Sequence, residues 1–270
     1  MTKELTPIGI VGCGALGKAL LQATTDGRLP VPVAGVTSRT VETAKAFLAT
    51  LPDPPLYLEL DELIARSGLV VETAGAEVVP ELARRTFAAG KALLVISMGA
   101  LLDHPELIDL AREKNCRLIL PSGAMAGLDG IKSACEGRVD HVTIITRKPI
   151  ESIADAPYLI EHGISLEGLT EELEVYRGPV REAVRGFPEN VNVAACVSLA
   201  GLGPDKTTIR ISAVPDLKRN SHTVEVEGEF GSLTIGIANI PSENPSTGKL
   251  TAMSIIRTIK DVLDPFQIGT

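Results

Sequence analysis

The chain has 270 residues, of which 44% are hydrophobic and 22% are charged, and its formal net charge is −8. This composition is that of a globular protein with a large core, long enough for two domains. The negative charge argues against a nucleic-acid-binding protein, because such proteins carry basic patches that match the phosphate backbone. Aromatic residues make up only 3% of the chain, so no stacking platform for single-stranded nucleic acid is expected.

The four cysteines are scattered, with no C-x-x-C pair and no histidine at ligand spacing. Neither a disulfide framework nor a zinc site is therefore expected. The first residues lack the charged and apolar regions of a signal peptide, and no apolar stretch is long enough to cross a membrane. We expect a cytoplasmic protein that holds no metal and does not associate with membranes.

Apolar and helical segments alternate regularly along the first part of the chain. The expected strands are Ile8–Val11, Val33–Val36, Leu69–Val71, Leu93–Ile96 and Leu118–Leu120, with a weaker one at Leu56–Leu58. The expected helices include Thr40–Leu51, Glu77–Ala89 and His104–Lys114. This alternation predicts an α/β domain whose parallel sheet is covered by helices on both faces.

A G-x-G-x-x-G pattern, Gly12-Cys13-Gly14-Ala15-Leu16-Gly17, lies between the first strand and a helical stretch. In this strand–turn–helix context the pattern predicts a dinucleotide-binding site. Gly12 would allow the tight turn, Gly14 would let the backbone approach a pyrophosphate, and Gly17 would let helix and strand pack closely. The helix N-terminus would offer N–H groups to the phosphates. The alternative is a glycine-rich turn that binds nothing.

The end of the second strand distinguishes between the two nicotinamide cofactors. A carboxylate at this position binds the adenine ribose hydroxyls of NAD, but the run Val36-Thr37-Ser38-Arg39-Thr40 contains none. Ser38 and Arg39 could instead bind the 2′-phosphate of NADP, by hydrogen bond and by charge. We expect use of NADP or of both cofactors, unless Arg39 is a solvated surface side chain.

The pattern changes after Pro121, where a loop of small residues, 122–127, marks the expected passage into a second domain. Longer strands are expected at Val139–Arg147, Thr207–Val214, Thr223–Val226 and Leu233–Ala238, the last two joined by a hairpin. These segments predict an α+β domain with a mixed or antiparallel sheet. A final helix, Leu250–Leu263, is expected to pack back onto the first domain. The expected domains are residues 1–123 together with 245–270, and residues 124–244.

One histidine in the second domain is placed for proton chemistry. Alternation puts His222 on the same face of its strand as Val224 and Val226. A histidine at the edge of an apolar face can act as a base near neutral pH, although a core histidine with a satisfied hydrogen bond fits the pattern equally well. The remaining histidines, interpreted as surface or structural residues, are His104, His141 and His162.

Two loop-to-helix segments carry further polar candidates. Asn190 could cap the alanine-rich helix that follows it, or it could hydrogen-bond the nicotinamide or ribose. The run from Asn244 to Lys249 opens the final helix with hydroxyls, N–H groups and a cation that would suit a substrate carboxylate. An ordinary transition from loop to helix explains this second segment equally well.

Together these features resemble the L-aspartate dehydrogenase family over essentially the whole chain. The matching segments are Gly12–Gly17, Ser97–Leu101, Pro121–Ala124, Gly127–Asp129, Thr146–Pro149, Phe187–Ala195, His222, and Asn244-Pro245 with Thr247. The segment Phe187–Ala195, taken with Ser122–Ala124 and His222, is far more specific than the glycine turn. Gly248-Lys249 lies outside the match, so a substrate role for that loop does not follow from it.

The resemblance implies a Rossmann domain and an α+β catalytic domain with the sheet at the interface, assembled as a homodimer. It implies NAD(P)-dependent oxidation of L-aspartate to iminoaspartate, which hydrolyses to oxaloacetate and ammonia or feeds NAD synthesis, and the reverse reductive amination. It also implies that His222 is catalytic and that Ala124 and Asn190 contact the cofactor.

The sequence thus predicts two sets of contacts around a catalytic His222. The expected cofactor contacts are Gly12, Gly14, Ala15, Leu16, Gly17, Ser38, Arg39, Ala74, Ala124 and Asn190. The expected substrate contacts are Asn192, Asn244, Thr247 and Lys249. Arg147 and Lys148 are further candidates for the substrate carboxylates, although each such side chain is more often solvated.

Two alternatives stay open at this point. One is another two-domain NAD(P)-dependent reductase that acts on a dicarboxylic imine or a semialdehyde, since dihydrodipicolinate reductase and homoserine dehydrogenase have related layouts. The paired-histidine, lysine-containing motif of the former is not found in this sequence. The other alternative is a non-catalytic NAD(P)-sensing protein, because a fold alone does not establish an activity.

Overall fold

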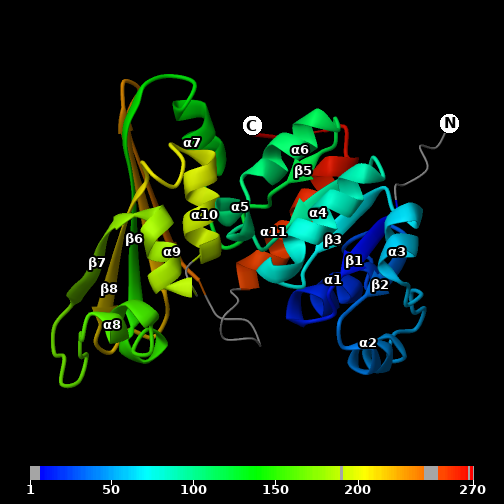
Figure 1. Cartoon of the computed structure of the whole chain (residues 1–270), viewed down its shortest axis with the longest axis horizontal. Helices are drawn as coiled ribbons and strands as arrows, with labels where there is room; N and C mark the ends of the chain where they lie inside the picture. Colours follow the sequence, from blue (N-terminus) through cyan, green and yellow to red (C-terminus); the bar gives the residue numbers. More distant parts are fainter. Residues whose placement is uncertain (1–6, 189–190, 240–248, 267, 270) are drawn as a thin grey trace. The chain divides into compact units, whose positions relative to one another are not determined.

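The computed structural model describes residues 7–188, 191–239, 249–266 and 268–269 (Figure 1). The chain divides into two compact units. The first unit is Met1–Pro121 with Ala252–Gln267, and the second is Ser122–Thr251 with Ile268–Thr270. Among the described helices, none combines the length and the apolar character needed to cross a membrane.

The first unit is built on a five-stranded parallel sheet, which confirms the expected α/β architecture. Its strands are β1 (Ile8–Val11), β2 (Val33–Thr37), β3 (Leu69–Glu72), β4 (Ala92–Val95) and β5 (Leu118–Ile119). Their spatial order is β2-β1-β3-β4-β5. The weak strand expected around Leu56–Leu58 is reduced to an isolated bridge between Val36 and Tyr57. The direction of winding reverses between β1 and β3, where doubly wound folds bind their ligands.

Helices connect these strands, as the alternation predicts. They are α1 (Ala15–Thr25), α2 (Val41–Leu48), α3 (Leu60–Arg66), α4 (Val79–Ala88), α5 (Ala100–Asp103) and α6 (Glu106–Glu113), with the short 3₁₀ helix η1 (Ala76–Val78). The last helix, α11 (Lys249–Leu263), also contributes to this unit. Its Ile255, Ile256 and Ile259 lie in one core cluster with Leu20 and Leu21 of α1. The C-terminal helix therefore returns to the first unit, because its apolar spacing presents one stripe to that core.

The second unit is built on a mixed sheet. Its strands are β6 (Val139–Pro149), β7 (Leu173–Pro179), β8 (Thr208–Val214), β9 (Ser221–Gly228) and β10 (Gly231–Ala238), in the order β10-β9-β6-β8-β7. Strands β6 and β8 run parallel, while the other neighbours are antiparallel. The predicted hairpin joins β9 to β10, with Gly228 paired to Gly231 across its two-residue loop.

Helices cover one face of this sheet. They are α7 (Leu128–Ala134), α8 (Pro157–Glu161), α9 (Val180–Gly186) and α10 (Val191–Ala200), with the 3₁₀ helix η2 (Ile150–Ser152). Figure 1 shows α7, α9 and α10 on the same side of the strands. The central strands β6 and β9 turn buried residues toward that side, among them Val142, Ile144, Val224 and Val226. The intervening residues form an opposite face that is partly exposed.

Strand β7 does not follow from the sequence pattern. This strand lies at the edge of the sheet, its register shifts between Glu174 and Tyr176, and it ends in Gly178-Pro179. An edge strand needs no continuous apolar run, and a bulge breaks the two-residue period that a sequence pattern depends on. The helices α7, α8 and α9 were also not predicted, because five to seven residues are too few for a helical period.

Candidate active site

The glycine turn joins β1 to α1 as the sequence predicts. Gly12 has a φ of +105°, a conformation that side chains disfavour. A Cβ on Gly12 would lie 2.7 Å from the carbonyl of Thr73, and one on Gly17 would lie 2.1 Å from the carbonyl oxygen of Gly12. The packing of the protein itself therefore requires glycine at both positions.

Gly14 differs from these two glycines. A Cβ at this position would meet no atom of the described structure within 4 Å. Gly14 caps α1, and both Gly14 and Ala15 are exposed. The first N–H groups of a helix have no partner inside it and carry a partial positive charge. This open, donor-rich end fits the pyrophosphate of a dinucleotide, so Gly14, Ala15 and Leu16 would hold it when bound.

The carboxyl ends of three neighbouring strands are tied together around this turn. The N–H of Gly12 donates to the carbonyl oxygen of Thr37 at 2.8 Å, and the N–H of Thr73 donates to that of Val11 at 2.8 Å. The hydroxyl of Thr73 is shared between the carbonyl oxygens of Val11 and Gly12, at 3.1 and 3.0 Å. These bonds fix the edge of the sheet at which such folds bind nucleotides.

A fully buried carboxylate at the end of β3 organises the same edge, and the sequence analysis missed it. Glu72 Oε1 accepts the N–H groups of Ala74 and Gly75 at 2.7 and 2.8 Å and the hydroxyl of Ser97 at 3.1 Å. Glu72 Oε2 accepts the N–H groups of Ile96 and Ser97 at 3.1 and 2.9 Å. Five donors replace the water that the buried charge gives up. The predicted cofactor contact Ala74 is thus held by Glu72.

The end of β2 carries the predicted cofactor contacts Ser38 and Arg39. Arg39 is exposed, and Ser38 is held through its carbonyl oxygen by the hydroxyl of Tyr57 at 2.8 Å. Lys45 lies over the ring of Tyr57, with 5.2 Å between the ammonium and the ring centroid. The sequence analysis missed this support, because Tyr57 reaches β2 from a stretch that forms a single bridge.

His222 lies on the buried face of β9, with 5% of its surface exposed. On the neighbouring strand β6, Thr146 pairs directly with His222, and the hydroxyl of Thr146 lies 3.0 Å from His222 Nδ1. Among the described residues, Thr146 is the one hydrogen-bond partner of the ring. Burial, and to a lesser extent the positive charge of Lys148, lower the pKa of His222 to about 4. The imidazole is therefore neutral at pH 7 and can donate through one nitrogen while it accepts through the other.

The loop of small residues, 122–127, is hydrogen-bonded to the segment that follows β10, at the end of the sheet where His222 lies. The side-chain amide of Asn239 donates to the carbonyl oxygen of Ala124 at 2.9 Å. Asn239 follows β10, in which Ile237 is the direct neighbour of His222. The thiol of Cys196 on α10 lies 3.7 Å from the carbonyl oxygen of Ser122, and burial raises its pKa to about 12. Cys196 is thus a protonated packing residue, and Ala124 is hydrogen-bonded to the residue that follows β10, the strand that pairs with β9.

For two of the remaining predicted substrate residues the structure gives the exposure and the element. Asn192 lies exposed in the first turn of α10, and Lys249 lies exposed as the first residue of α11. The predicted Asn190, Asn244 and Thr247 lie outside the described residues. The other histidines are peripheral, since His104 is close to Glu106, His162 stacks on Tyr158, and His141 is exposed.

A doubly wound domain with this glycine turn and a second domain with a buried histidine are the parts of an NAD(P)-dependent dehydrogenase. Residues 12–121 match the family model described as homoserine dehydrogenase, NAD binding domain. Residues 129–262 match the model described as aspartate dehydrogenase, C-terminal. The protein is thus an oxidoreductase that uses NAD or NADP and acts on a small molecule.

Full-length relatives narrow this class. The chain is 42% identical over 268 residues to an L-aspartate dehydrogenase of Methanosarcina mazei, covering 97% of this chain and 99% of the relative. It is 39% identical over 270 residues to L-aspartate dehydrogenase 3 of Bordetella bronchiseptica, covering 100% and 99%. The crystal structure of aspartate dehydrogenase from Thermotoga maritima superposes with a TM-score of 0.75 at 26% identity, covering 98% and 99%. The chain belongs to the L-aspartate dehydrogenase family.

The glycine turn yields a prediction that separates folding from cofactor binding. Gly17→Ala forces its Cβ into the carbonyl of Gly12 and should destabilise the protein by about 1–3 kcal/mol. Gly14→Ala meets open space, so its melting temperature should stay close to that of the wild type while its Kd for NADPH rises about tenfold or more. Thermal unfolding and fluorescence titration measure the two effects. Unchanged NADPH affinity in a folded Gly14→Ala variant would contradict a role for this turn in binding.

Proposed function

We propose that the protein is an L-aspartate dehydrogenase that oxidises L-aspartate to iminoaspartate with NAD or NADP and can run the reductive amination in reverse. Iminoaspartate then hydrolyses to oxaloacetate and ammonia. The observation that carries this proposal is the buried, neutral His222 held by Thr146, in a chain that matches L-aspartate dehydrogenases over nearly its full length.

The chemistry requires a proton acceptor next to the substrate amine. A hydride can leave Cα only when the amine is neutral, because an ammonium group has no lone pair with which to form the imine. In the neutral tautomer that carries its proton on Nδ1, His222 would donate to Thr146 Oγ1, 3.0 Å away, and present the lone pair of Nε2 as the acceptor. When bound, the nicotinamide ring supplies the hydride chemistry. The role of His222 is to accept the proton of the substrate amine, or that of the water that attacks the imine.

Replacement of His222 tests this role. His222→Ala should lower kcat by about 10²–10⁴-fold, the usual contribution of a general base, while the Kd for NADPH stays within about twofold, since no residue of the glycine turn is altered. Steady-state kinetics with L-aspartate and fluorescence titration with NADPH give the two numbers. His162→Ala is the matched control, because His162 is exposed directly after α8 and stacks on Tyr158. Turnover of His222→Ala within a few fold of the wild type would exclude His222 as the base.

We also propose that the enzyme prefers NADP to NAD. The support is the basic end of β2, where Arg39 is exposed beside Ser38 and no carboxylate follows the strand. A guanidinium binds a phosphate through strong, charge-assisted hydrogen bonds, which the ribose hydroxyl of NAD cannot form.

Arg39→Gln should therefore raise the KM for NADPH about tenfold, since it removes one such bond, and leave the KM for NADH nearly unchanged. Initial rates with each reduced cofactor measure this difference. Arg28→Gln is the control, because Arg28 is an exposed arginine of the same unit that pairs with Asp26. Equal changes for the two cofactors would show that Arg39 does not bind the 2′-phosphate.

A homodimer assembled through the second sheet is the third element of the proposal. Its support is the sheet face opposite the helices, where Thr143, Ile145, Thr223 and Thr234 are half-buried or exposed. These branched side chains lie among the charged Arg147 and Glu225 of the same face, and a surface that mixes such residues suits an interface between two copies. Light scattering should give twice the chain mass of 28.4 kDa, and Thr234→Arg should reduce it to one chain, whereas Thr50→Arg, on an exposed loop of the first unit, should not. A monomeric wild type would contradict this element.

A further inference from the structure

Lys148 is a buried cation beside the proposed base. It lies on β6 two residues after Thr146, so both side chains belong to the same face of the sheet. Only 2% of its surface is exposed. Of the lysines and arginines that the structure describes, no other is buried. Burial strengthens the attraction between this ammonium group and any anion that reaches it, because the local dielectric constant is low.

The surroundings of Lys148 define a small polar end on an otherwise apolar sheet face. On β8, the direct neighbours of Thr146 and Lys148 are Ile211 and Ala213, both buried. On β9, His222 is the direct neighbour of Thr146, and the positive charge of Lys148 contributes to the lowered pKa of His222. A hydroxyl, an imidazole and an ammonium group thus occur together, and each matches a group of a dicarboxylic amino acid.

We propose that Lys148 binds one of the substrate carboxylates and so places the substrate amine at His222. This inference rests on the proposed function, because it assumes a substrate with two carboxylates. Removing Lys148 would leave a buried carboxylate without its partner, which weakens binding far more than the loss of an exposed ion pair. The bound carboxylate would also offset the positive charge that disfavours protonation of His222.

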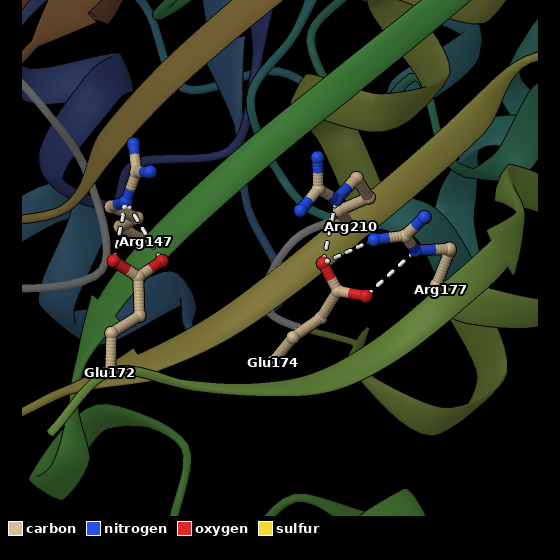
Figure 2. A network of polar contacts seen from close by, with 5 residues as sticks. All are labelled: Arg147, Glu172, Glu174, Arg177 and Arg210. Carbon is tan, nitrogen blue, oxygen red and sulfur yellow. Dashed lines mark hydrogen bonds and ion pairs between the residues drawn. The ribbon is translucent and has the colours of Figure 1, made fainter.

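Several other cations of the second unit have carboxylate partners away from His222. Arg147 points to the opposite sheet face, where its Nε lies 2.9 and 3.0 Å from the two carboxylate oxygens of Glu172 (Figure 2). Figure 2 also shows Arg177 and Arg210 sharing the carboxylate of Glu174. Lys249 is exposed at the start of α11. Of the three cations that the sequence suggested for the substrate, Lys148 is therefore the one on the same face as His222.

The test compares Lys148→Met with the wild type in the full-length enzyme. Two quantities are measured: the KM for oxaloacetate with ammonia and saturating NADPH, and the Kd for succinate in the presence of NADP, by calorimetry. Succinate carries both carboxylates but no reacting group, so its binding does not depend on turnover. Loss of the buried charge pair should raise both the KM for oxaloacetate and the Kd for succinate at least about 30-fold. Lys148→Arg should recover part of the lost affinity, because it keeps the charge.

Two controls keep the result interpretable. Arg147→Met removes a cation from the neighbouring position on the opposite face and should change neither quantity by more than about twofold. An unchanged Kd for NADP, together with a single thermal unfolding transition near that of the wild type, shows that the Lys148→Met variant is folded. If this variant does not fold, Lys148→Gln replaces it, since glutamine removes the charge and keeps a polar end.

A change of less than threefold in both quantities, in a folded variant, would overturn the assignment. So would a fall in kcat with unchanged KM and succinate affinity, because Lys148 would then act on the reaction without binding the substrate. Failure of the proposed function looks different. A wild type that binds succinate through Lys148 but does not reduce oxaloacetate with ammonia would retain the carboxylate site and lose the aspartate reaction. A wild type that neither binds succinate nor reduces oxaloacetate with ammonia would overturn both the role of Lys148 and the proposed function.

Discussion

Strands β6 and β9 pair with Thr146 directly opposite His222, and the proton chemistry proposed for this enzyme depends on that register. A shift of one residue would turn His222 to the partly exposed face and separate it from Thr146 and Lys148. The apolar residues Val224 and Val226 stabilise the register, because they are buried on the same face as His222. The packing that folds the sheet therefore also buries the imidazole and holds its pKa at about 4.

In the first unit, the buried carboxylate of Glu72 determines the arrangement of the site in a comparable way. Glu72 is buried, and four backbone N–H groups and the hydroxyl of Ser97 stabilise it. These bonds join the segments that follow β3 and β4, so the carboxylate fixes two neighbouring loops at once. Together with the close approach of Gly17 to Gly12, they shape the nucleotide-binding edge before any cofactor binds.

Features set by local pattern could be predicted from the sequence, and features set by pairing could not. The parallel sheet, the glycine turn and the buried face of β9 follow from apolar runs, glycine spacing and alternation. Glu72 could not be predicted, because its hydrogen-bond donors come from the two loops that follow β3 and β4. Only the fold shows that these loops lie on either side of the carboxylate. Thr146 and Asn239 act on partners 76 and 115 residues away, and no local pattern carries that information. The same register separates Lys148 from Arg147, which the sequence left equivalent.

The absorbance of reduced cofactor in the presence of purified enzyme, oxaloacetate and ammonia, followed with NADPH and NADH in parallel, shows directly whether this enzyme reduces an imine. We expect consumption that requires oxaloacetate and ammonia together, because the imine is the species that accepts the hydride. Consumption with oxaloacetate alone would indicate reduction of the ketone and would contradict an amino-acid dehydrogenase. No consumption by an enzyme that binds the cofactor tightly would point to another imine substrate or to a sensor of the cofactor.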